Sequence, residues 1–109
     1  MIEKNLFYEN KKNLEEAIEY SHNSIVSKII IDKKNGTITL FAFDKGQKLS
    51  EHSAPYDAMI QIIEEEAEII INNKISTLKK DEVIIIPANI PHAINANSRF
   101  KMLLTMIKD

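Results

Sequence analysis

The chain contains no cysteine, no tryptophan and only 2 glycines among its 109 residues. The absence of cysteine excludes disulfide bonds, thiolate catalysis, iron–sulfur clusters and cysteine-ligated zinc. With so few glycines, the sequence contains neither a glycine-rich phosphate-binding loop nor the glycine-flanked serine turn of a hydrolase, and it lacks the helical zinc-protease motif. Several common enzyme classes are therefore excluded before any fold is considered.

Strong charge bias and long apolar runs are also lacking. The formal net charge is -2 and no basic block occurs, so we expect no nucleic-acid partner. No run approaches the roughly 18 apolar residues of a membrane span, so we expect no membrane partner. The first residues lack the basic and apolar regions of a signal peptide, which favours a cytoplasmic protein.

One helix followed by strands is the organisation that the pattern predicts. Leu14, Ala17 and Ile18 recur at helical spacing within Asn10–Tyr20,. Asn13 followed by Glu16 resembles a capping box, although a start at Asn10 fits equally well. Beyond Ser21, runs rich in β-branched residues predict strands at residues 25–32, 37–43, 58–63, 67–71, 74–77, 83–86, 93–96 and 100–107,.

Tight turns separate several of these strands. Asn35-Gly36 predicts a type I′ hairpin, in which both central residues need positive φ. Asn72-Asn73 predicts a second hairpin, because asparagine tolerates the left-handed conformation. Short strands at regular spacing indicate a sandwich or barrel. We therefore predict one all-β domain over residues 1–109, with a short N-terminal helical segment (1–23) and a β-barrel (24–109).

The spacing of glycine, proline and histidine adds a family resemblance. Gly46 precedes His52 by six residues and Pro87 precedes His92 by five. These intervals resemble the two cupin signatures, and the resemblance runs from Gly46 to about Ala96 without an insertion inside either signature. The chain is similar to the small single-domain cupins of the conserved-barrel type. The resemblance implies a cupin-type double-stranded β-helix, which is a jelly-roll barrel.

The metal ligands of the family are only half present in this sequence. The first and last ligand histidines of the signatures fall on His52 and His92. The second histidine falls on Ala54 and the acidic ligand falls on Ala58. The remaining glycines of the signatures fall on Glu65, Asp81 and Asn89, and the closing asparagine falls on Ala96, with Asn95 one residue early. The metal-ligand set is incomplete.

An incomplete set has a direct consequence for metal binding. Catalytic zinc usually has three protein ligands, and non-heme iron has two histidines and a carboxylate. Asp57 lies next to a required position, but neighbouring strand residues point to opposite faces, so only a bulge at Pro55 would turn it inward. We expect no tightly bound metal and no cofactor, and weak binding of a divalent ion would use His52 and His92.

Strand alternation predicts a pocket around the two histidines. If His52 points inward, so do the residues at alternate positions, and past a bend at Pro55 the same face continues. The predicted lining comprises His52, Ala54, Ala58, Ile60, Ile62, His92 and Ile94, with Ala96 on the same side,. Phe41, Phe43 and Tyr56 either frame the pocket mouth or pack in the core, and Met102 and Met106 are typical core residues.

Three functions fit these observations. The first is a metal-free small-molecule-binding cupin for sensing or sequestration, whose ligand has an apolar body and a polar or anionic group near the histidines. The alternative is an enzyme: a metal-dependent oxygenase, isomerase or decarboxylase with a reduced metal shell, or a metal-free isomerase with one histidine as base. The third is a structural dimer module. We expect a homodimer in which the 25–31 segment pairs or exchanges with its neighbour. The simplest alternative to these three functions is that each histidine is a buried core residue.

Overall fold

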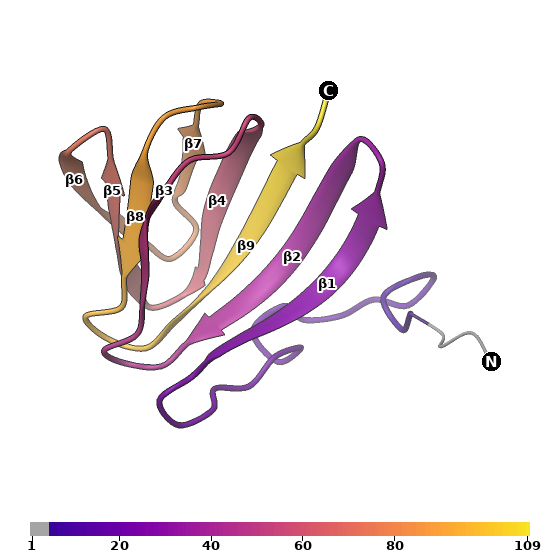
Figure 1. The fold of residues 1–109 in the computed structure, drawn as a ribbon. Coiled ribbons are helices and arrows are strands. Elements are labelled where there is room, and N and C mark those ends of the chain that lie inside the picture. The colour runs from indigo at the N-terminus through magenta and orange to yellow at the C-terminus, as the bar shows by residue number, and fades with distance from the viewer. Residues whose placement is uncertain (1–4) are drawn as a thin grey trace.

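The computed structural model describes residues 5–109, which form two antiparallel sheets. The first sheet has the strand order β1-β2-β9-β4-β7 and the second has the order β3-β8-β5-β6 (Figure 1). The strands are β1 (Ile25–Lys33), β2 (Gly36–Phe43), β3 (Lys48–His52), β4 (Asp57–Glu64), β5 (Glu66–Ile71), β6 (Lys74–Lys79), β7 (Val83–Ile86), β8 (His92–Asn95) and β9 (Phe100–Ile107). The all-β prediction is confirmed.

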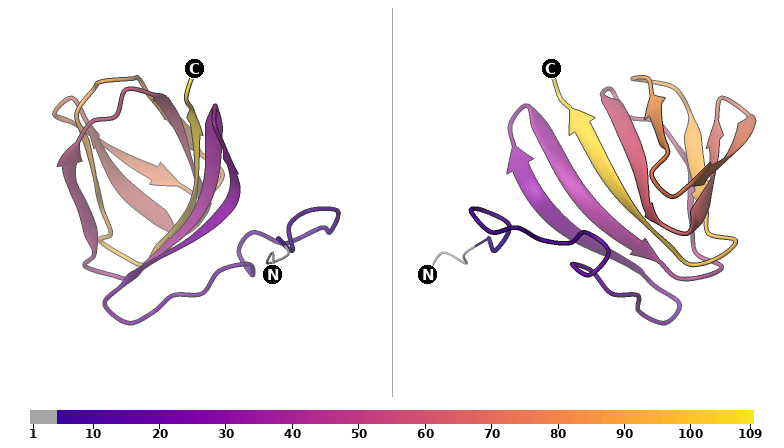
Figure 2. Two further views of the ribbon diagram at one scale, coloured as in Figure 1. Left: turned by 45° about the vertical axis from the view of Figure 1, so that its right-hand side comes forward. Right: turned by 180° about the vertical axis from the view of Figure 1, so that it is seen from behind.

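The two sheets face each other and enclose a common interior (Figure 2). Pairing of distant strands produces this arrangement, since β9 at the C-terminus lies between β2 and β4. β1 and β7 form the two edges of the larger sheet. Every predicted strand is present, and the observed ends differ from the predicted ends by at most a few residues.

The two predicted hairpins have different turn chemistry. Asn72 and Asn73 both have positive φ, of 49° and 67°, as a type I′ turn requires,. The turn between β1 and β2 instead has Lys34 and Asn35 at its centre, because Lys33 pairs with Gly36, and neither central residue has positive φ. The hairpin at this place is confirmed, but its predicted type I′ turn is wrong.

Gly36 has a packing role instead. A Cβ atom at this position would lie 3.1 Å from the carbonyl oxygen of Met106 in β9. β2 and β9 pair along their whole length, from Gly36 and Ile107 to Phe43 and Phe100. The glycine therefore permits the close approach of the two backbones at the start of this ladder.

The helix predicted over Asn10–Tyr20 is not formed. Residues 5–109 contain no helix, and hence none that is long and apolar enough to cross a membrane. Within Asn10–Tyr20 one turn forms, in which the N–H of Ala17 donates to the carbonyl of Leu14, 3.3 Å away. The backbone N–H of Glu16 donates to Asn13 Oδ1, so the predicted cap exists without a helix behind it. The first four residues of the predicted 1–23 segment lie outside the described residues.

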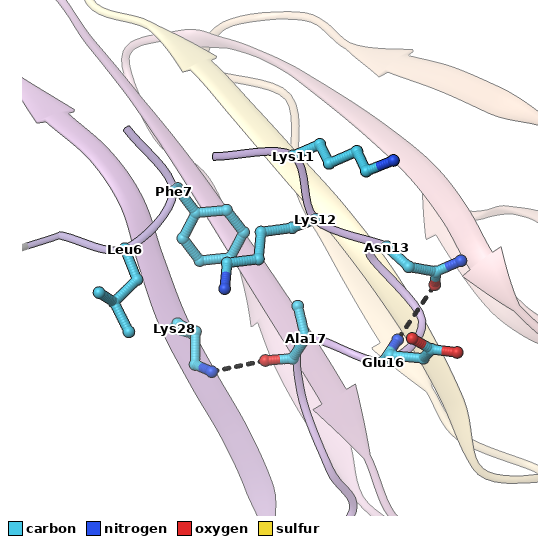
Figure 3. A pocket seen from close by; sticks show the side chains of 8 residues that line it. All are labelled: Leu6, Phe7, Lys11, Lys12, Asn13, Glu16, Ala17 and Lys28. Atoms are coloured by element: carbon cyan, nitrogen blue, oxygen red, sulfur yellow. Dashed lines mark hydrogen bonds between the residues drawn. The ribbon is translucent and has the colours of Figure 1, made fainter. Parts of the chain in front are cut away.

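Lysine side chains of the sheet bind backbone carbonyls that would accept hydrogen bonds within a helix. Lys28 Nζ in β1 donates to the carbonyl of Ala17, and Lys101 Nζ in β9 donates to the carbonyl of Glu15 (Figure 3 shows the first of these). Ile18 is buried against Leu40 on the outer face of β2. An isolated helix of this length is marginal in water. The segment instead uses its apolar side chains and carbonyls to cover the outer face of the sheet.

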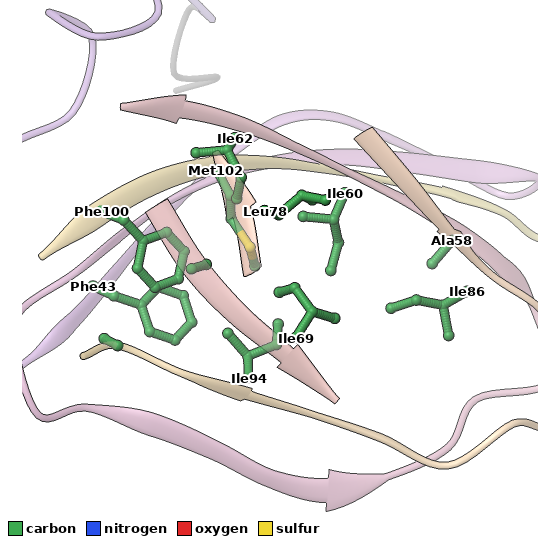
Figure 4. Close-up of a cluster of buried hydrophobic side chains, with 12 residues drawn as sticks. Phe43, Ala58, Ile60, Ile62, Ile69, Leu78, Ile86, Ile94, Phe100 and Met102 are labelled. Atoms are coloured by element: carbon green, nitrogen blue, oxygen red, sulfur yellow. The ribbon is translucent and has the colours of Figure 1, made fainter. Parts of the chain in front are cut away.

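The main core lies between the two sheets. Phe43 and Phe100 are completely buried and stack with ring centroids 4.6 Å apart at one end of the interior (Figure 4). Alternate residues of β4, β5 and β9 continue this core toward Ala58 and Ile86. The period-2 alternation of a strand accounts for the pattern, because one face of each sheet points inward.

The positions at which the signatures carry glycine share an unusual backbone conformation. Gly46 has a φ of 88°, and Glu65, Asp81 and Asn89 have φ of 61°, 70° and 67°. Left-handed backbone costs an ordinary L-residue about 1–2 kcal/mol, and aspartate and asparagine tolerate it better than glutamate does. The turns of the signatures are therefore retained although their glycines are replaced, and Glu65 is the most strained replacement.

We predict that Glu65→Gly increases the free energy of unfolding by about 1 kcal/mol, because glycine adopts positive φ without strain. Glu66→Gly is the matched control: it lies one residue further on, inside β5, and should decrease stability by about 0.5–1 kcal/mol. Urea unfolding of the two variants gives the comparison. Loss of stability in both variants would contradict the strain assigned to Glu65.

Candidate ligand-binding site

His52 and His92 face each other across two neighbouring strands. They are directly paired residues in the ladder between β3 and β8. Their ring centroids lie 4.3 Å apart and the ring planes are inclined by 58°. The side chain of His52 is exposed and that of His92 is half-buried. The structure thus brings together the two histidines that the sequence places 40 residues apart.

A bulge in β3 makes this pairing compatible with the pocket. Leu49 pairs with Ile94 and His52 pairs with His92, so β3 contains one more residue than β8 between the two pairs. A regular strand would turn His52 to the face opposite Leu49, because side chains alternate. The extra residue restores the direction, and both side chains point into the interior,. The sequence indicates a bend at Pro55 but carries no signal for this bulge.

Backbone carbonyls determine the protonation pattern of both rings. Nδ1 of His52 lies 2.9 Å from the carbonyl oxygen of Ser50, and Nδ1 of His92 lies 3.0 Å from that of Ile90. A carbonyl only accepts hydrogen bonds, so each Nδ1 carries the hydrogen. In the neutral imidazole the other nitrogen is then an acceptor. The site therefore offers a ligand two Nε2 acceptor atoms.

A cavity of about 230 Å³ begins at the two histidines and extends between the sheets. Its lining is apolar except for His52, His92 and Tyr56, as far as the described residues show. The lining residues are Leu49, His52, Ala54, Tyr56, Ala58, Ile60, Ile86, His92, Ile94, Met102, Leu104 and Met106. Both sheets contribute to the cavity.

All but one of the predicted pocket residues line this cavity, namely His52, Ala54, Ala58, Ile60, His92 and Ile94. Ile62 is the exception: its side chain is completely buried in the core beyond the cavity, and Ala96 is buried there as well. Tyr56 lines the cavity, whereas Phe41 and Phe43 belong to the core. Ile62 points to the interior, as predicted, but it lies in the packed core and not at the cavity.

β7 and β9 also contribute to the cavity, which the sequence did not predict. Ile86 and the alternating residues Met102, Leu104 and Met106 line the cavity. Strand parity alone places these β9 residues on one face, so the signal was present in the sequence. The sequence does not reveal that β9 pairs with β4, and this pairing places Met106 opposite Ala58 and Leu104 opposite Ile60.

The donor atoms do not fit a metal site of three or more protein ligands. Within residues 5–109, no three side chains of histidine, cysteine, aspartate or glutamate are placed to hold one ion. Asp57 Oδ1 accepts a hydrogen bond of 2.8 Å from the backbone N–H of Ala88, and Asp57 precedes the inward-facing Ala58 on β4. With two imidazoles as its only protein ligands, a metal ion would have water in most of its coordination positions.

The groups with shifted pKa values lie outside the cavity. Burial, followed by a hydrogen bond to Glu64, raises the pKa of Tyr20 far above its ordinary value. The backbone N–H of Asn23 is the main cause that lowers the pKa of Asp44. Tyr20 also contacts Arg99, whose guanidinium lies 4.4 Å from the ring centroid. These contacts attach the N-terminal segment to the outer face of the sheet and have no part in the cavity.

Known structures with this arrangement identify the family. A cupin superfamily protein from Desulfitobacterium hafniense has a TM-score of 0.90 and 32% sequence identity to this chain, covering 97% of each chain. The chain belongs to the cupin superfamily. The resemblance inferred from the signatures, and the double-stranded β-helix that it implies, are therefore confirmed.

Two further solved structures are similar to this chain. A conserved protein of unknown function from Streptococcus pyogenes has a TM-score of 0.91 and 32% identity, covering 97% of this chain and 93% of that chain. A cupin 2 conserved barrel domain protein from Leptotrichia buccalis has a TM-score of 0.86 and 41% identity over 89% of this chain. The 109-residue chain matches only 47% of the length of the Leptotrichia protein. No family model and no curated protein matches the chain.

We predict that Ala54→His with Ala58→Glu turns this cupin into a metal-binding one. Both positions line the cavity beside His52 and His92, so the variant has the three or more donors that zinc or iron requires. Elemental analysis should give about one ion per variant chain and well under one ion for the natural sequence. Ala54→His alone, which adds a third imidazole without burying a carboxylate, is the second variant. Stoichiometric metal in the natural protein would contradict this prediction.

Proposed function

We propose that this cupin binds a small molecule without a tightly held metal ion, and that it acts by sensing or sequestering that molecule. The observation that carries this proposal is the apolar cavity that ends at two histidines with available Nε2 atoms. A concave, mostly apolar cavity with a few converging polar groups is the usual form of a small-molecule site.

The cavity volume limits the size of the ligand. A water molecule in the liquid occupies about 30 Å³, and an engineered cavity of about 150 Å³ binds benzene. The cavity of about 230 Å³ therefore holds a benzene-sized apolar body together with a small polar head group. The head group lies at the histidines, because the rest of the lining, Tyr56 excepted, offers only apolar contacts.

Binding accounts for the lining better than a metal-dependent reaction does. A general acid–base reaction needs a base and an acid that both reach the reacting atoms. An imidazole Nε2 atom and the Tyr56 phenol on the cavity wall are such groups, so a metal-free isomerase with one histidine as base is the alternative. A metal-dependent reaction would need further donors in place of Ala54 and Ala58.

Filling the cavity tests this proposal. We predict that Ala58→Leu lowers the affinity for any cavity ligand at least tenfold, because the added atoms occupy ligand space. Ala93→Leu is the matched control, since Ala93 lies next to His92 on β8, is not part of the cavity lining and belongs to the alternate face,. Native mass spectrometry of the purified proteins, with binding of benzene-sized probes measured by calorimetry, provides the readout. Equal binding by both variants, or no bound small molecule under any condition, would reject a cavity ligand.

We further propose that the protein is a homodimer that uses the edge strand β1. Ile29 in β1 is 59% exposed, and an exposed apolar edge strand pairs readily with another strand. Asn5 Nδ2 already donates to the carbonyl of Ile30, and a bulge follows Ile29. The Ile25–Ile29 part of the strand is therefore the part available to a second copy.

We predict that Ile29→Lys converts the dimer into a monomer, because a charged side chain on an edge strand opposes edge-to-edge pairing. Ile75→Lys is the matched control: Ile75 lies in β6, far along the chain in the other sheet, and is 67% exposed. Light scattering should give twice the chain mass of 12.5 kDa for the natural protein and for the control. A monomer mass for the natural protein at tens of micromolar would refute the dimer.

A further inference from the structure

We infer that the cavity selects a ligand with an uncharged head group that donates two hydrogen bonds, such as a primary amide. This inference rests on the proposed function, since it assumes that the cavity holds a small molecule. It concerns the chemical class of that molecule.

The first step is the hydrogen-bond balance of the histidine pair. Each ring uses its N–H to bind a backbone carbonyl of its own strand segment, at 2.9 Å for His52 and 3.0 Å for His92. Neither ring has a second N–H in the neutral state. The pair therefore presents two acceptors and no donor, with the ring centroids 4.3 Å apart.

The second step concerns charge. The described cavity lining contains no carboxylate, lysine or arginine. A charged head group beside the half-buried His92 would lose part of its hydration without a counter-charge in the lining,. A carboxylate would also place its lone pairs against the two Nε2 acceptors, and an ammonium would find no negative group. An uncharged NH₂ group avoids both penalties and has two N–H donors for the two Nε2 acceptors.

The charged groups around the histidines do not change this balance. Glu51 precedes His52 on β3 and is exposed, and Glu68 on β5 accepts hydrogen bonds from Asn95 and Asn97. Lys108 Nζ lies over the ring of Tyr56, 5.6 Å from its centroid. Asp57 accepts the N–H of Ala88. Tyr56 lines the cavity and can donate its hydroxyl hydrogen to an amide carbonyl,.

Protonation of either ring would reverse this preference. A protonated imidazole has N–H groups on both nitrogens and accepts no hydrogen bond. An uncharged NH₂ head group would therefore bind a protonated pair more weakly than a neutral pair, whereas a carboxylate would bind the protonated pair more tightly.

Probes of one shape and different head groups provide the test: benzamide, benzoate, benzylamine and toluene, measured by calorimetry with EDTA present. At pH 8, benzamide should bind at least tenfold more tightly than each of the other three. His52→Leu and His92→Leu each remove one acceptor. Each should weaken benzamide about tenfold, the effect of one hydrogen bond, and leave toluene unchanged.

The outcomes separate this inference from the proposed function. If benzoate, benzylamine or toluene binds as tightly as benzamide, and Ala58→Leu abolishes that binding, the cavity is a ligand site and the head-group inference is wrong. The same conclusion follows if the two histidine variants bind benzamide like the natural protein. If no probe binds and native mass spectrometry finds no small molecule, both the inference and the proposed function fail.

Discussion

Contact between the apolar inner faces of the two sheets is the interaction on which the rest of this molecule depends. Strand alternation sends every second side chain of β4, β5, β8 and β9 into one interior,. Large side chains such as Phe43 and Phe100 fill one end of it. Near Ala54 and Ala58 the side chains are small and the interior stays open. The core and the cavity are thus two ends of the same space, and residue size decides where one becomes the other.

Much of this arrangement could be predicted from the sequence, because it depends on local signals. The β-branched runs gave the strands, and the spacing of Gly46, His52, Pro87 and His92 gave the family. Positive φ at Glu65, Asp81 and Asn89 shows why that spacing works without its glycines. The backbone turns are retained, and residues other than glycine adopt the positive φ at a cost in conformational free energy.

The errors arise where long-range contacts override local preference. The apolar spacing of Leu14, Ala17 and Ile18 is genuine, but Ile18 packs on Leu40 and sheet lysines bind the carbonyls that a helix would have used. The bulge before His52 depends on its register against β8, which no pattern within β3 reveals. The roles of Gly36 and Met106 likewise depend on β9 lying beside β2 and β4.

The stacked rings of Phe43 and Phe100 have a further consequence for exchange with solvent. They belong to a densely packed group that includes Ile62, all completely buried, in the part of the core beyond the cavity. The barrel interior is therefore filled at this end. A molecule bound as we propose would leave at the other end, beside the exposed His52, so a side chain proposed to recognise its head group also lies on its exit route.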